Sequence, residues 1–248
     1  MLSLVITACK KPKEEQNNPD NSNTPKGTLM FHLHTYIDEH EVDLYNAVYA
    51  NDEGRSLSLS VAQLYISEIE LVKLDGSGYT IPSSKIFKIL DQETFVAGEV
   101  PVGNYKGIKF KVGLSNSDNA KLPSASADSA IFKHSEMWMG VSAQPDGYVF
   151  MNVQGTIDTT SDLSGAMIPF TYKIGGNLNY KQVTMPEKNF SIMENQTEYA
   201  HIKINYNKLF HGVQLNDINN LSVLTLSDNS GVVAQKVVNN IPTMFIYE

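Results

Sequence analysis

The chain has 248 residues, of which 42% are hydrophobic and 19% charged, and its formal net charge is -8 at pH 7. This length suffices for a sizeable core, and the acidic balance argues against nucleic acid as a partner, because phosphate binding requires a concentrated basic face. No apolar run approaches the ~18 residues of a membrane-spanning helix, so we expect no segment to span a bilayer.

The first residues carry the only cysteine. Residues 1–9 read MLSLVITAC, and the small residues before Cys9 resemble the lipobox of bacterial lipoproteins, in which the cysteine is acylated. No basic region precedes it, so we interpret residues 1–9 as a truncated or misassigned signal; the alternative is a free cysteine on a flexible tail. Residues 10–26 contain no apolar side chain and are expected to be a disordered linker.

The folded domain is expected over residues 27–248. Its clearest pattern is residues 29–37 (LMFHLHTYI), where Leu29, Phe31 and Leu33 alternate with polar or amphipathic residues, as in a strand with one buried face. Further strands are predicted at 56–61, 63–74, 79–81, 105–112, 147–155, 169–174, 198–206, 221–226 and 241–247, with a hairpin turn at 75–78. Short helical pieces are predicted at 124–134 and 232–239. Many short strands with Gly, Asn, Asp and Pro turns indicate an all-β, mostly antiparallel β-sandwich with short helical insertions.

The strongest chemical signal is a pair of histidines on the first strand. His32 and His34 are two residues apart, so their rings lie on one face with Cα atoms ~6.6 Å apart, close enough to reach one metal ion. His40 and His134 are the candidates for additional ligands. Imidazoles suit copper, zinc or nickel, whereas the alternative is a polar, solvent-facing strand without a metal.

Other candidates are weaker. His134 with Met137 and Met139 has the donor types of a soft Cu(I) site, although packing is the more frequent role of such methionines. We interpret His201 as part of a solvated strand face and His211 as a turn residue, so neither is a first-choice ligand.

A group of acids follows the histidine strand and has the chemistry to orient imidazoles from a second shell: Asp38, Glu39, Glu41 and Asp43.

Several ordered pieces resemble the MbnP-like family, extracytoplasmic β-sandwich proteins of bacteria, some of which bind copper. The pieces that carry the resemblance are YANDEG (49–54), LYISEIEL (64–71), VPVGNY (100–105), FKVG (110–113) with Asn119, GYVF (147–150) with Gly155, FTYKIG (170–175), LFHG (209–212) and NNIPTMF (239–245). The resemblance implies a metal-binding or accessory protein rather than an independent enzyme.

In copper-binding members, histidines cooperate with a tryptophan that a partner di-haem oxidase converts to kynurenine. This chain departs from that pattern twice. Lys173 stands where the family often has a histidine, and the only tryptophan, Trp138, lies farther upstream of Gly147 than the family's tryptophan-rich run. The tryptophan oxidation is therefore not transferred to this chain, and copper is kept as the expected metal.

Residues and resemblance together predict a non-catalytic protein of the Gram-negative cell envelope. Its lipid anchor at Cys9 would hold it at the outer membrane or the periplasmic face, and its histidines would bind a transition metal, copper first. No nucleophile elbow, zinc-protease motif, phosphate loop or dinucleotide fingerprint occurs, so we expect no enzyme. The alternative function is a metal-free surface lipoprotein that binds a protein or glycan through loops at one end of the sandwich.

Overall fold

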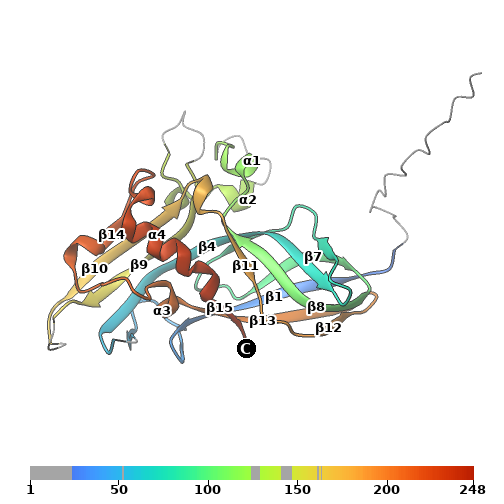
Figure 1. Ribbon diagram of the computed structural model, residues 1–248, viewed down its shortest axis with the longest axis horizontal. Helices are drawn as coiled ribbons and strands as arrows, with labels where there is room; N and C mark the ends of the chain where they lie inside the picture. The colour runs from blue at the N-terminus through green and yellow to red at the C-terminus, as the bar shows by residue number, and fades with distance from the viewer. Residues whose placement is uncertain (1–23, 52, 124–128, 141–146, 161, 163) are drawn as a thin grey trace, which may run out of the picture.

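The computed structural model describes residues 24–51, 53–123, 129–140, 147–160, 162 and 164–248. Two β-sheets face each other around a shared apolar core (Figure 1), which confirms the predicted β-sandwich. Within the described residues, the smaller sheet has the order β15-β13-β1-β2, with β7 also paired to β1. Its strands are β1 (Lys26–Ile37), β2 (His40–Glu41), β7 (Thr94–Pro101), β13 (Thr197–Asn205) and β15 (Phe245–Tyr247).

The larger sheet is organised around one long strand, β4, which runs from Ser56 to Lys73 and pairs with β8 and β9. The other strands of this sheet are β3 (Val48–Ala50), β5 (Gly78–Thr80), β6 (Lys85–Lys88), β8 (Gly103–Val112), β9 (Val149–Asp158), β10 (Met167–Gly175), β11 (Lys181–Thr184), β12 (Phe190–Ile192) and β14 (Ser222–Val223). Most pairs are antiparallel, as predicted, whereas β1 with β13 and β10 with β14 are parallel.

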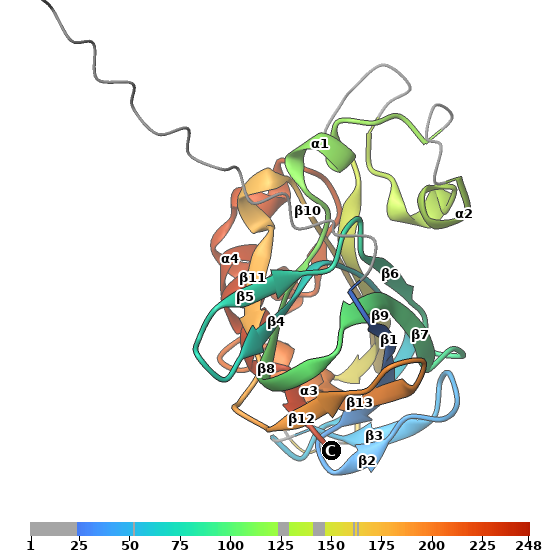
Figure 2. The same ribbon diagram turned by 90° about the vertical axis from the view of Figure 1, so that its right-hand side faces the viewer.

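Helices are short and peripheral. They are α1 (Asn116–Asn119), α2 (Ser129–Phe132), α3 (Tyr206–Leu209) and α4 (Val232–Asn240), together with 3₁₀ turns at Ser135–Met137, Asn177–Asn179, Ile218–Asn220, Asp228–Ser230 and Ile241–Thr243. Figure 2 shows α1 and α2 at one end of the molecule, with β2 and β3 at the other. The helix expected at 232–239 is confirmed. Helix α2 lies within the other predicted segment, 124–134, of which residues 124–128 are outside the described part.

The alternation in β1 determines how the two sheets face each other. Leu29, Phe31 and Leu33 are fully buried in the core, and the residues between them turn to the outer face of the smaller sheet. The ring of Phe31 meets Phe110 of β8 edge-on across the core at 5.9 Å between centroids, and Phe110 meets Phe245 of β15 at 5.0 Å. This aromatic row connects the sheets directly beneath the outer face of β1.

Strands β2, β3, β6, β7, β11 and β12 were not predicted, and the predicted strands differ from the observed ones at three further places. Segments 56–61 and 63–74 form one strand, because Ala62 continues the pairing of β4 with Val153 of β9. The predicted strand 241–247 begins as a 3₁₀ turn that contains Pro242, and only Phe245–Tyr247 is extended. Segment 221–226 contributes just Ser222–Val223.

The described residues contain no helix with the length and apolar character that crossing a membrane requires.

Candidate metal centre

Strand β1 presents two histidines on the outer face of the smaller sheet. His32 and His34 alternate with the buried Phe31 and Leu33, so the same periodicity that fills the core places both imidazoles together on the opposite side. Their ring centroids are 4.3 Å apart. The predicted pair is therefore present as one local cluster.

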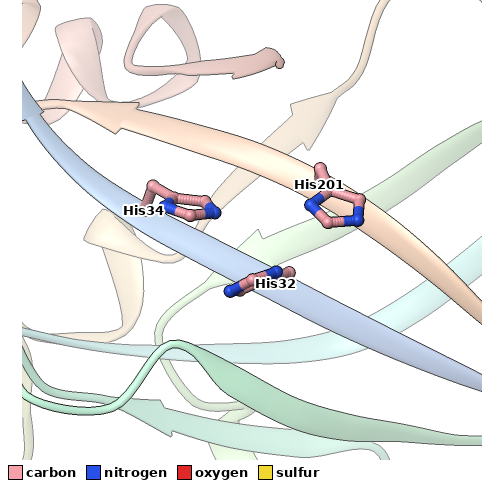
Figure 3. A group of neighbouring side chains, drawn as sticks. All are labelled: His32, His34 and His201. Atoms are coloured by element: carbon pink, nitrogen blue, oxygen red, sulfur yellow. The ribbon is translucent and has the colours of Figure 1, made fainter. Parts of the chain in front are cut away.

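A third histidine comes from the neighbouring strand. Strand β13 runs parallel to β1 with His201 directly beside His32 in the register, so both residues face the same side of the sheet. The centroid of the His201 ring lies 4.9 Å from that of His32 and 6.4 Å from that of His34 (Figure 3). We call His32, His34 and His201 the histidine triad.

The triad has the donors and the spacing of a transition-metal site. One ring nitrogen from each histidine lies within 4.8 Å of the others. A metal about 2.0–2.1 Å from each nitrogen requires donors about 3.3 Å apart in tetrahedral geometry and at most about 4.2 Å apart. A small rotation of the imidazole rings would bring the nitrogens from within 4.8 Å of one another to the spacing that a metal requires. The half-exposed His201 side chain is free to rotate in this way. The residues present therefore fit a metal ion held by three imidazoles.

Two carboxylates support the histidines from the side. The Glu41 carboxylate on β2 accepts a hydrogen bond from Nδ1 of His34, and the Glu93 carboxylate lies 3.2 Å from Nε2 of His32. A carboxylate on one ring nitrogen fixes the tautomer of a histidine and raises the basicity of the other nitrogen, as is typical of metal ligands. His34, Glu41 and Glu93 also form a second group with one donor atom each within 4.8 Å, so the acids and histidines share one polar surface.

Glu93 is held in place by the backbone and by a buried cation. Its carbonyl oxygen accepts a hydrogen bond of 2.8 Å from the backbone N–H of Leu33. In the preceding turn, the fully buried ammonium group of Lys88 donates to the carbonyl oxygens of Ile89 at 2.6 Å and Gln92 at 2.8 Å. The ammonium group thus stabilises the turn from which Glu93 reaches His32.

Burial lowers the pKa of Lys88 to about 8, with the nearby acids Glu93 and Asp91 opposing the shift. Between about pH 8 and pH 10.4 the unfolded chain therefore binds more protons than the folded chain, and folding stability rises with pH. Relative to a Lys88→Met variant, we expect the wild-type free energy of unfolding to increase by about 2 kcal/mol between pH 7.5 and 9.5. Urea unfolding at both pH values measures this gain, and parallel pH profiles of the two proteins contradict it.

The two other predicted ligands do not join the triad. His40 pairs with Ile37, a core-facing residue, whereas its neighbour Glu41 pairs with Tyr36. Glu41, and not His40, is therefore in register with the outer-face residues of β1, and the exposed ring of His40 lies 6.3 Å from that of Tyr49. His134 lies beyond α2, where its ring packs on Phe87 with centroids 4.0 Å apart.

The methionines near His134 have packing roles, as favoured from the sequence. Met137 is fully buried in a second apolar cluster built around Tyr65, Phe132 and Tyr148. Trp138 packs against the same cluster, edge-on to Tyr148 at 4.8 Å. This cluster borders the larger sheet, whereas the triad lies on the outer face of the smaller one.

His211 lies in the turn after α3, where its backbone N–H donates to the carbonyl oxygen of Lys208 at 3.2 Å. Cys9, the predicted lipidation site, lies outside the described residues.

The fold and the outer-face triad define a class: a β-sandwich with a surface cluster of histidines and carboxylates. A sequence model of the MbnP family matches residues 26–226, and the chain belongs to this family. The solved structure of MbnP from Methylosinus trichosporium is similar in fold, with a TM-score of 0.51 and 17% identity over 75% of this chain and 78% of that chain. A comparison with curated proteins finds no match. The family resemblance drawn from the sequence motifs is thus confirmed.

Proposed function

We propose that this protein binds a transition-metal ion, copper first, at the histidine triad and presents it without catalysing a reaction. The observation that carries the proposal is the convergence of His32, His34 and His201 from two neighbouring strands, with a donor nitrogen from each within 4.8 Å of the others. Membership in the MbnP family supports a metal-related role for a cluster of this kind.

The proposed location is the envelope of a Gram-negative bacterium. Acylation at Cys9, followed by the polar linker, would hold the sandwich away from the outer membrane or the periplasmic face, and a di-haem oxidase is the partner that family analogy suggests. Because residues 1–9 are interpreted as a truncated signal, the test places a complete export signal before Ile6 and labels a Gram-negative host with a fatty-acid analogue. Label on the wild type that is lost in Cys9→Ala supports it, and an unlabelled wild-type protein contradicts it.

Calorimetric titration with Cu(II) and Zn(II) tests metal binding. We expect one saturable site in the wild-type protein and none in a variant in which all three triad histidines are alanine. If the wild-type protein shows no saturable binding, the metal proposal fails and the metal-free binding module becomes the better reading.

Removing the carboxylate beside His34 should weaken the site without destroying it. Glu41→Gln keeps the size of the side chain but replaces the charged acceptor of the His34 Nδ1–H group. Loss of such a supporting carboxylate typically costs about 10–100-fold in metal affinity, and we expect a loss in this range. The exposed Asp43 is a matched control, because Asp43→Asn removes the same charge two residues away. Equal affinities of the two variants would contradict the role given to Glu41.

A further inference from the structure

Glu248, the residue that follows β15, brings a carboxylate to the triad. Strand β15 pairs with β13, and the backbone N–H of Glu248 donates to the carbonyl oxygen of His201 at 3.2 Å. This pairing places the Glu248 side chain over the triad. Its Oε2 lies 3.5 Å from Nε2 of His34 and 3.8 Å from Nδ1 of His201, while its Oε1 lies 3.5 Å from the hydroxyl of Tyr36.

The contact between Glu248 Oε2 and His34 Nε2 is favourable only if a positive charge lies between these two atoms. Because Glu41 accepts the proton on Nδ1 of His34, a neutral imidazole has only a lone pair on Nε2. That nitrogen is buried and makes no hydrogen bond to any described residue, yet it faces a carboxylate oxygen, which is also an acceptor. Two acceptors facing each other at a buried nitrogen are unfavourable unless a cation or a proton lies between them.

The spacing matches a shared metal ion. Two donors of one tetrahedral ion, each about 2.0–2.1 Å from it, lie about 3.3 Å apart. The 3.5 Å between Glu248 Oε2 and His34 Nε2 is close to this value, and the 3.8 Å to His201 Nδ1 requires only a small closure. One carboxylate oxygen therefore lies within coordination range of an ion held by two of the triad histidines.

We propose that Glu248 is a fourth ligand, which makes the site a mixed imidazole–carboxylate centre that takes divalent Cu(II) or Zn(II) in preference to Cu(I). Carboxylate oxygen is a hard donor, whereas Cu(I) is selected by soft thiolate and thioether ligands. Glu41, Glu93 and Glu248 also place three carboxylates around the triad, and their field favours a doubly charged ion over a singly charged one. Glu248 lies beyond residues 26–226, so the family match does not include this ligand. The inference rests on the proposed metal binding by the triad.

The test compares Glu248→Gln with Glu99→Gln in the full chain. Glu99 is an exposed acid on β7 of the same sheet, so both variants lose one carboxylate and one charge. Affinities for Zn(II) and Cu(II) are measured by competition with chelators in air, and those for Cu(I) by competition with a Cu(I) chelator under nitrogen. Thermal unfolding of the metal-free proteins verifies that the variants are folded.

For Glu248→Gln we expect a loss of at least about tenfold in Zn(II) and Cu(II) affinity, as for other carboxylates of metal sites, and a change below about threefold for Cu(I). Glu99→Gln should match the wild type for all three ions. Unchanged divalent affinity in a folded Glu248→Gln protein overturns the inference, because Glu248 would then not be a ligand. An equal loss for Cu(I) also overturns it, because Glu248 would then bind the metal without selecting a divalent ion. If the wild-type protein binds metal and the triple histidine variant does not, the proposed function stands even when Glu248→Gln behaves like the wild type. Only the assignment of Glu248 as the fourth ligand then fails.

Discussion

His34→Ala should raise the Kd for Cu(II) by more than about 100-fold, which exceeds the usual effect of losing a supporting residue. His34 lies at the centre of the polar surface: its Nδ1 is held by Glu41, and its Nε2 lies 3.5 Å from Glu248. Its side chain is also the least exposed of the triad, so its geometry is the most constrained by packing. Calorimetric titration of the variant beside the wild type measures the loss.

His40→Ala and His134→Ala are the matched controls for this prediction. Both remove an imidazole that the structure places outside the triad, so their affinities should stay within about twofold of the wild type, a difference of about 0.4 kcal/mol. A large loss in His134→Ala with little change in His34→Ala would contradict the assignment and point to a site near Met137.

Phe31→Ala should destabilise the fold strongly. Phe31 is fully buried, directly precedes His32 in β1, and joins the sheets through its edge-on contact with Phe110. Truncating a buried phenylalanine costs about 3–5 kcal/mol of stability, because the protein loses the free energy of burying the ring and is left with a cavity. For a domain of this size, the corresponding fall in Tm is about 10 °C, measurable by circular dichroism.

Val96→Ala on β7 serves as the comparison. Its side chain is 61% exposed on the smaller sheet, so its truncation should change the free energy of unfolding by no more than about 0.5 kcal/mol. Equal stability of Phe31→Ala and Val96→Ala would contradict the view that the aromatic row beneath β1 connects the sheets.

Local patterns were sufficient for the fold class and the longest strands, but they did not predict β2, β3, β6, β7, β11 or β12. The alternation in residues 29–37 predicts β1, and the turn residues at 75–78 predict the hairpin between β4 and β5, because both signals are complete within a few residues. The errors occur where tertiary pairing decides. Ala62 is a weak strand former that β9 holds in register, and the apolar run at 241–247 does not reveal that Ile241 begins a 3₁₀ turn.

The candidate site was predictable only as far as one strand extends. His32 and His34 follow from the side-chain period of two, but His201 depends on the parallel register of β1 with β13, which no local pattern encodes. Glu41 rather than His40 lies beside the triad because of the register in which β2 pairs with β1. The turn at Asp38, whose backbone has a positive φ of 56°, sets this register, and a change of one residue would bring the other side chain to the outer face. The alternation of residues 198–206 did predict that His201 faces outward. It could not predict that His32 of β1 would lie directly beside it.

Anomalous diffraction from a crystal soaked in Cu(II) tests the central claim most directly, because it locates the metal without assuming its ligands. The account predicts one strong copper peak on the outer face of the smaller sheet, about 2.0–2.1 Å from a ring nitrogen of each triad histidine. A map in which copper lies only at His134, His211 or another site, with none at the triad, would contradict it.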